Sequence, residues 1–300
     1  MLLYQVRDHP KFANDEIGAP GEEQRQYPAV LKNAGDTINV LTNKWCESWL
    51  EGTRNDADIE KRLEGMVEEV IWSVVICFGI GGWQLRDEGQ PLRADFSMCV
   101  HCRVQHKPVF AHDRCAMLHN RTGFPNRMQL VTSAYFLLAL VLPSPNVPYR
   151  ALSQASRLAL LKAYTAMWVG RCVAHGRRSA VLPIAEFLDT TRGQLSAPAA
   201  AASLPFVTRT ALGARVGPWE RIIVNSTAHP DAHVAGVTRA LAAFAARWGS
   251  REPGYFGSEG GLEGREALDG TLFVRVAGLV MDKLGWAYES GHELGQWDGE

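Results

Sequence analysis

The stretch LEGMVEEVIWSVVICFGIGGW, which runs from Leu63 to Trp83, decides the fold class. In its first half the apolar residues recur at steps of three and four, which is the spacing of a helix with one buried face. In its second half apolar residues occupy every side, as they do in a helix enclosed by its neighbours. We therefore predict a core helix over residues 59–83, with Asp56 or Asp58 as its N-cap.

The same periodicity recurs along the rest of the chain. It predicts one or two helices in the segment 22–50. It also predicts one helix in each of four further segments: 130–142, 153–175, 231–248 and 267–284. Strand-like alternation is limited to the short runs 206–210 and 222–224, which fit helices or loops equally well. The chain is therefore predicted to be an all-α protein that forms a single helical domain over residues 1–300.

Composition and charge exclude several classes of protein. With 46% hydrophobic and 21% charged residues, the chain is neither disordered nor a coiled coil. Its net charge of -1 argues against nucleic acid as a partner. Six cysteines are too few for a disulfide scaffold, the first residues do not form a signal peptide, and Pro143 cuts short the longest apolar run. We therefore predict a cytoplasmic protein with reduced thiols and no transmembrane segment.

Residues 99–127 have the most unusual local composition, because they hold three of the six cysteines and four of the nine histidines. Four of these residues have the spacing of a tetrahedral zinc site: Cys99, Cys102, Cys115 and His119. However, His106 and His112 occupy positions where a fold built around zinc needs apolar packing. The pattern favours an irregular insertion whose Cys and His residues are incidental, and zinc binding is the alternative.

Two other features have a functional and a structural interpretation. Gly79-Ile80-Gly81-Gly82 contains half of a dinucleotide fingerprint, but Gln84 replaces the third glycine and no strand precedes it, which favours the end of a helix. Aromatic residues on the predicted core faces, such as Trp72 and Tyr164, could line a cavity for a flat ligand. Filling the core is the more common role of such residues.

Several segments of the chain, taken in order over residues 1–290, resemble the questin oxidase-like family of fungal aromatic polyketide metabolism. The resembling segments are 80–83, 94–96, 130–134, 160–164, 173–177, 182–184, 229–234, 239–241, 268–275 and 284–286. The resemblance implies an all-helical oxidoreductase that opens or expands a ring of an anthraquinone-type substrate, as a monooxygenase with a Baeyer-Villiger-like outcome. It also implies the use of O2 and, in the questin-cleaving members, of NADPH. Some relatives look like non-haem iron enzymes that hold the metal with histidines and an apparently carbamylated lysine.

Three departures from the family pattern bear on activity. The family carries paired His motifs ahead of the point where this chain begins, so we expect an N-terminally truncated protein relative to its family. Residues 99–127 interrupt a core helix of the family pattern, either as a real insertion or as a gene-model artefact, and Gln129 stands in place of a family histidine. Gly236 stands where relatives carry the lysine. These departures predict an incomplete metal site and impaired activity.

The predicted site joins residues in or beside the resembling segments. The predicted catalytic residues are Gln129, His233 and Asp95, of which Gln129 and His233 would hydrogen-bond a quinone carbonyl or phenolate. Trp83 and Ser133 are the predicted substrate-binding residues. The expected partners are a small aromatic polyketide and O2, and the oligomeric state is left open. The alternative function is a non-catalytic zinc-binding or interaction protein that acts through residues 99–127.

Overall fold

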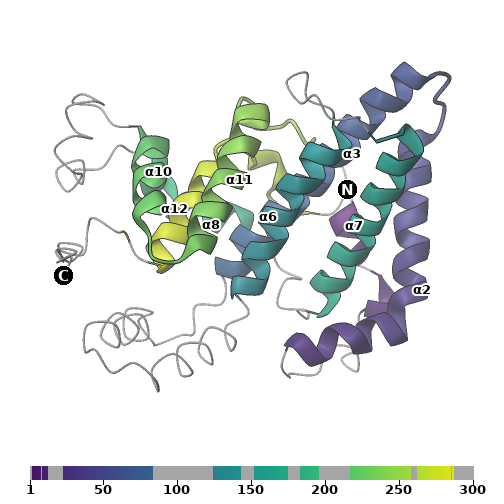
Figure 1. The fold of residues 1–300 in the computed structure, drawn as a ribbon, viewed down its shortest axis with the longest axis horizontal. Coiled ribbons are helices and arrows are strands. Elements are labelled where there is room, and N and C mark those ends of the chain that lie inside the picture. The colour runs from purple at the N-terminus through teal and green to yellow at the C-terminus, as the bar shows by residue number, and fades with distance from the viewer. Residues whose placement is uncertain are drawn as a thin grey trace, which may run out of the picture. The chain divides into compact units, whose positions relative to one another are not determined.

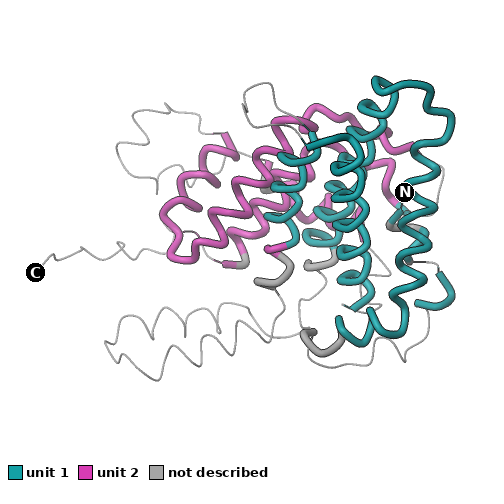
Figure 2. The backbone as a smooth tube through the Cα atoms, turned by 45° about the vertical axis from the view of Figure 1, so that its right-hand side comes forward, with its two compact units in different colours: residues 1–84, 130–182, 258–263 teal, residues 85–129, 183–257, 264–300 magenta. Residues whose placement is uncertain are grey.

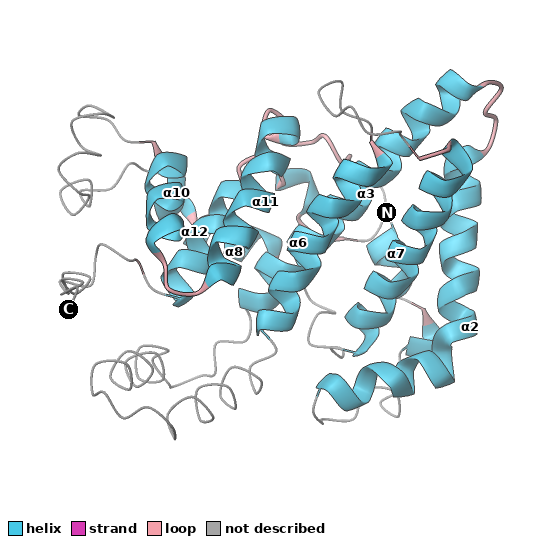
Figure 3. Cartoon of the chain, viewed as in Figure 1, coloured by secondary structure: helices cyan, strands magenta, loops and turns pink. Residues whose placement is uncertain are grey.

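The computed structural model describes residues 2–7, 9–12, 23–83, 124–142, 152–174, 183–195, 217–257, 262–284 and 286. All regular structure within these ranges is helical (Figure 3), which confirms the all-α prediction. The chain divides into two compact units (Figure 2). Unit 1 comprises residues 1–84, 130–182 and 258–263, and unit 2 comprises residues 85–129, 183–257 and 264–300. The single domain over 1–300 stays a prediction.

The long helices of unit 1 lie where the apolar periodicity predicts them (Figure 1). In chain order the elements are α1 (Leu2–Arg7), η1 (Pro10–Phe12), α2 (Glu23–Leu50), α3 (Asp56–Trp83), α6 (Phe124–Val141) and α7 (Gln154–Ala174). The first residues of α6, 124–129, are assigned to unit 2 and the rest of the helix to unit 1. The segment 22–50 forms one helix, with Pro28 inside it. Helix α6 begins at Phe124, inside the predicted insertion, and its start was therefore predicted too late. Residues 99–123 lie outside the described residues.

The predicted N-cap of α3 was wrong. Asn55 Oδ1 accepts a hydrogen bond from the N–H of Asp58 at 2.9 Å, which makes Asn55 the cap. In return, the carboxylate of Asp58 accepts the N–H of Arg54 at 3.2 Å. Because the helix begins earlier than predicted, Asp56 and Asp58 both lie in its first turn, where negative charge stabilises the positive end of the helix dipole.

Helix α3 is enclosed by its neighbours, as its sequence indicates. Every residue from 70 to 76 is buried, so no side of this part of the helix faces solvent. Burying a large apolar side chain stabilises a fold by about 1.5–3 kcal/mol, which makes α3 the main source of apolar stabilisation in unit 1. None of the described helices combines the length and apolarity that crossing a bilayer requires.

Helix α3 runs parallel to α7. At one end of the pair, Arg157 of α7 contacts Glu60 of α3, and at the other end Cys172 contacts Cys77. The sequence separations of these two contacts are 97 and 95 residues, and such nearly constant values mean that both helices advance in the same direction. The short turn between α2 and α3 makes that pair antiparallel.

Helix α6 runs antiparallel to α7. Near the beginning of α6, the carbonyl oxygen of Leu130 accepts a hydrogen bond from Tyr164 of α7 at 2.9 Å. Near its end, the carbonyl oxygen of Val141 accepts one from Arg157 at 3.2 Å. The α7 residue number falls as the α6 number rises, so the directions are opposite. The four long helices of unit 1 therefore alternate up and down along the chain, which is the connectivity of simple helical bundles.

A buried arginine connects three of these helices. Arg157 of α7 forms a two-pronged ion pair with both carboxylate oxygens of Glu60 in α3, and one of its nitrogens also donates to the carbonyl of Val141 in α6. The Arg157 side chain is only 8% exposed, whereas that of Glu60 is 41% exposed. The hydrogen bonds from Arg157 hold the pKa of Glu60 below its ordinary value of 4.5.

The ion pair makes a specific prediction for pH dependence. Because the pKa of Glu60 is lowered in the folded state, the pair stabilises the fold above the ordinary carboxyl range, and this contribution is lost as pH falls through the lowered pKa. Glu60→Gln should therefore decrease the free energy of unfolding by about 1 kcal/mol at pH 7. Urea titrations at pH 7 and pH 3 should show that the difference from the wild type is smaller at pH 3, because Glu60 is then more protonated.

The exposed Glu51, in the turn after α2, offers a matched control. Glu51→Gln removes the same charge and should leave the stability at pH 7 unchanged within about 0.5 kcal/mol. An equal loss of stability at pH 7 and pH 3 for Glu60→Gln would show that the variant acts through packing and not through the ion pair.

Unit 2 is built from shorter helices. Its elements are α8 (Ile184–Thr190), η3 (Arg192–Leu195), α10 (Pro218–Ala228), α11 (Ala232–Trp248), η5 (Arg265–Ala267) and α12 (Leu272–Leu284). The helix predicted over 231–248 is confirmed, and the run 222–224 belongs to α10. Phe244 of α11 stacks against Phe273 of α12 with 6.2 Å between ring centroids, so these two helices share a core. The run 206–210 lies outside the described residues.

The helix predicted over 267–284 was wrong at its start, because α12 begins at Leu272. The carboxylate of Asp269 accepts the N–H of Thr271 at 2.9 Å, a local bond that competes with helix formation. Gly270 then passes directly over the end of α11: a Cβ placed on it would lie 2.1 Å from the carbonyl oxygen of Gly249. The close backbone contact sets the turn between η5 and α12.

Two glycines should respond to alanine in opposite ways. Gly270→Ala should lower the free energy of unfolding by about 2 kcal/mol or more, because the new methyl group meets rigid backbone. Gly35→Ala should raise it by about 1 kcal/mol, because Gly35 lies inside α2 and a Cβ added to it would meet no atom within 4 Å. Thermal and urea unfolding of both variants checks the two signs, and a neutral Gly270→Ala would contradict the close contact.

Candidate functional site

Five of the predicted site residues lie outside the described residues: Asp95, Cys99, Cys102, Cys115 and His119. Their predicted catalytic and zinc-binding roles therefore stay predictions. Trp83 is the last residue of α3. Three predicted residues have described side chains: Gln129 is exposed on α6, Ser133 is half-buried on α6, and His233 is exposed on α11. Ser133 belongs to unit 1 and His233 to unit 2, so neither unit by itself contains both.

Ser133 takes part in a three-oxygen cluster between α6 and α7. Its hydroxyl donates to the carbonyl of Leu130 at 2.9 Å and lies 3.2 Å from the hydroxyl of Tyr164. The Tyr164 hydroxyl donates to the same carbonyl at 2.9 Å. Both hydroxyls thus serve one backbone oxygen near the beginning of α6. The apolar periodicity places Tyr164 on a core face but carries no signal for this partner.

The cluster suits Tyr164 for holding two helices together. Burial raises the pKa of Tyr164 well above its ordinary value, and the neighbouring Ser133 hydroxyl opposes this only in part. The phenol therefore stays protonated at every physiological pH, so that it donates a hydrogen bond and does not act as a base. Its contacts assign it to the α6–α7 junction.

Removal of the Tyr164 hydroxyl tests this assignment. Tyr164→Phe should lower the free energy of unfolding by about 1 kcal/mol, because Leu130 keeps the bond from Ser133 and loses only one donor. Ser133→Ala should have a similar effect, and the two losses should not be additive in the double variant, because the two hydroxyls lie 3.2 Å apart and share one acceptor. Additive losses in urea titrations would contradict a shared acceptor.

Helix α11 begins with a carboxylate–imidazole pair. Asp231 is the N-cap, and its Oδ1 accepts the N–H of His233 at 2.9 Å. The same oxygen lies 2.9 Å from Nδ1 of the His233 ring. The ring is 54% exposed, whereas the carboxylate is 22% exposed. Because a carboxylate only accepts, Nδ1 carries the hydrogen and Nε2 is left as the acceptor of the neutral ring.

A second histidine, His229, hydrogen-bonds to the backbone at this turn. Nδ1 of His229 accepts the N–H of Asp231 at 3.0 Å, and its Nε2 lies 3.2 Å from the carbonyl oxygen of Leu284 at the end of α12. With Nδ1 accepting, Nε2 is the nitrogen that donates to the Leu284 carbonyl. His229 therefore holds the backbone of Asp231 in place while the His233 ring faces outward.

The arrangement of Asp231 and His233 is that of an oriented general base. A carboxylate that receives the Nδ1 hydrogen fixes the tautomer and stabilises the imidazolium that forms when Nε2 accepts a proton. The sequence identifies His233 as a candidate, but the prediction did not connect His233 with Asp231. The signal that could have predicted this contact is the i, i+2 spacing of the two residues at the beginning of a helix, with Asp as the N-cap.

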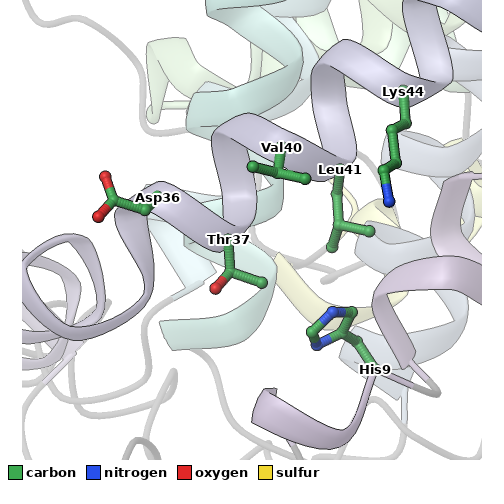
Figure 4. A pocket seen from close by; sticks show the side chains of 6 residues that line it. All are labelled: His9, Asp36, Thr37, Val40, Leu41 and Lys44. Carbon is green, nitrogen blue, oxygen red and sulfur yellow. The ribbon is translucent and has the colours of Figure 1, made fainter.

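A shallow cavity of about 320 Å³ lies beside α2 in unit 1 (Figure 4). Its lining residues are His9, Asp36, Thr37, Val40, Leu41 and Lys44. In Figure 4 the His9 ring and the Leu41 side chain point toward one another, whereas the Asp36 carboxylate points away. Nδ1 of His9 accepts the N–H of Lys11 at 3.3 Å. The cavity contains none of the predicted site residues.

The described residues do not fit either of the groups that the family resemblance implies. Within the described ranges, no three His, Cys, Asp or Glu side chains gather closely enough to hold a metal ion. The run from Gly79 to Gly82 lies inside α3, so it does not form the loop that cradles a pyrophosphate at the beginning of a helix. We therefore derive no step through iron or NADPH.

Comparison with known proteins adds no further assignment. No family model, no curated protein and no solved structure matches this chain. The assignment of a function therefore depends on the sequence segments and on the local geometry described above.

Proposed function

We propose that this chain is a cytoplasmic oxidoreductase of the questin oxidase-like type, which opens or expands a ring of an anthraquinone-type aromatic polyketide with O2. Two lines of support favour this function. All regular structure in the described residues is helical, as the family resemblance requires. In addition, the segment His229–Val234, which is one of the resembling segments, carries an imidazole oriented for proton transfer.

The observation that carries the proposal is the pair formed by Asp231 and His233. A hydroxyanthraquinone presents a phenolic hydroxyl group, and Nε2 of His233 is free to accept its proton because Nδ1 is held by Asp231. The Asp231 carboxylate then stabilises the positive charge on the imidazole ring. Loss of the proton leaves a phenolate, whose ring is richer in electrons and reacts more readily with an oxidant.

Exposure of the His233 ring gives a flat substrate direct access to this base. His229 keeps the turn rigid, because it bonds both the backbone of Asp231 and the end of α12. A fixed base is more effective than a mobile one, since little order has to be created when the substrate binds. The role proposed for His233 is therefore proton removal, with Asp231 as the residue that positions it.

Three variants separate catalysis from folding. His233→Gln should lower kcat/KM for hydroxyanthraquinone cleavage about 100-fold or more, because the base is lost. Asp231→Asn keeps an N-cap and should fold normally, yet it should also lower kcat because the carboxylate charge is lost. Asp231→Ala should in addition lower the free energy of unfolding by about 1 kcal/mol, because the cap is removed. Ring cleavage is measured by mass spectrometry with O2 and NADPH supplied.

Binding provides a readout that does not depend on turnover. The visible absorbance of a hydroxyanthraquinone changes when its phenol ionises, so the wild-type protein should shift the spectrum of the bound compound, and His233→Gln should not. Full activity of His233→Gln would refute the proposed base. Absence of any activity, together with one bound zinc ion that is lost in Cys99→Ser and Cys102→Ser, would instead favour the non-catalytic zinc-binding protein.

A further inference from the structure

Two cysteines from different helices face one another in unit 1. The sulfur atoms of Cys77 in α3 and Cys172 in α7 lie 4.0 Å apart, and both side chains are half-buried. Cys46 provides a contrast within the same unit, because it is fully buried. Burial raises the pKa of the Cys46 thiol to about 11, although Lys162 opposes the shift. The chain thus places one inert thiol and one accessible pair in the same unit.

The helices already hold the two sulfur atoms close to bonding geometry. A disulfide has a sulfur–sulfur distance of about 2.05 Å, so the atoms must approach by about 2 Å, which rotation about the Cα–Cβ bonds can supply. The Arg157–Glu60 ion pair fixes the register of α3 against α7 at the other end of the same contact.

We propose that Cys77 and Cys172 form an oxidation site, in which a peroxide converts the two thiols into a disulfide that ties α3 to α7. One thiol loses its proton, the thiolate attacks the peroxide, and the O–O bond breaks to give a sulfenic acid and hydroxide, which takes up the released proton to form water. The second thiol then attacks the sulfenic sulfur, the S–S bond forms, and the S–O bond breaks with release of a second water. Hydrogen peroxide accepts the two electrons that the sulfur atoms lose.

The bond has a structural consequence that can be measured. It closes a loop between residues separated by 95 positions in the sequence, so it removes freedom chiefly from the unfolded chain. The fold should therefore become more resistant to heat in its oxidised form, with a rise in Tm of about 5 °C or more. Dithiothreitol should reverse the rise, because exchange with a dithiol restores both thiols.

The test uses the full chain with Cys99, Cys102 and Cys115 replaced by Ser, which leaves only Cys46, Cys77 and Cys172. The folded protein is treated with hydrogen peroxide, blocked with N-ethylmaleimide and digested with trypsin without reduction. Mass spectrometry should find the peptide 63–86 linked to the peptide 172–177. The peptide 45–54, which holds Cys46, should stay unlinked. The wild-type chain is treated in parallel and should yield the same linked peptide.

Two conservative variants complete the design. Cys172→Ser should abolish both the linked peptide and the rise in Tm, whereas Cys46→Ser should keep both. Recovery of Cys77 and Cys172 only as separate blocked or over-oxidised peptides would overturn the proposed site. A linked peptide without a higher Tm would overturn the claim that the bond ties α3 to α7, as would a rise in Tm that persists in Cys172→Ser.

Discussion

The pairing of Arg157 with Glu60 is the constraint on which unit 1 depends. A guanidinium group that is almost wholly buried needs a carboxylate within reach, since an unpaired buried charge is far more costly than an unpaired buried amide. Arg157 satisfies this need across α3 and also serves the last turn of α6. The ion pair thus fixes the register of α3 against α7 at this end of their contact.

The same logic distinguishes the two polar clusters. Ser133 and Tyr164 both donate their hydroxyl hydrogens to one backbone oxygen, so these hydrogen bonds hold α6 against α7. Asp231 and His233 differ, because their bond leaves a ring nitrogen directed outward. A cluster whose donors and acceptors all face inward stabilises the fold, and one that leaves an acceptor exposed is available to a ligand. This difference is why the proposed function rests on His233 and not on Ser133.

Periodicity predicted the long helices well, because apolar spacing reports directly on burial. It failed where local hydrogen bonds determine the residue at which a helix begins. Asn55 caps α3 in place of the aspartates, and Asp269 delays the start of α12. The candidate site was predictable in its parts, since His233 and Asp231 both stand out in the sequence. Their mutual bond was not, because it depends on the backbone angle at the cap. Contacts such as that between Ser133 and Tyr164 join residues distant in the chain, and a single sequence carries no signal for them.

The separation of α3 from α7 along the chain has an implication for insertions. Contacts between these helices close a loop of roughly a hundred residues, and the entropy lost on closing a loop grows only with the logarithm of its length. The 25 residues from 99 to 123, which precede α6, lie within that loop. Deleting them would change the closure entropy by only about 0.3 kcal/mol. Evolution, or an error in splicing, could therefore lengthen or shorten this connection at almost no thermodynamic penalty to the helices on either side.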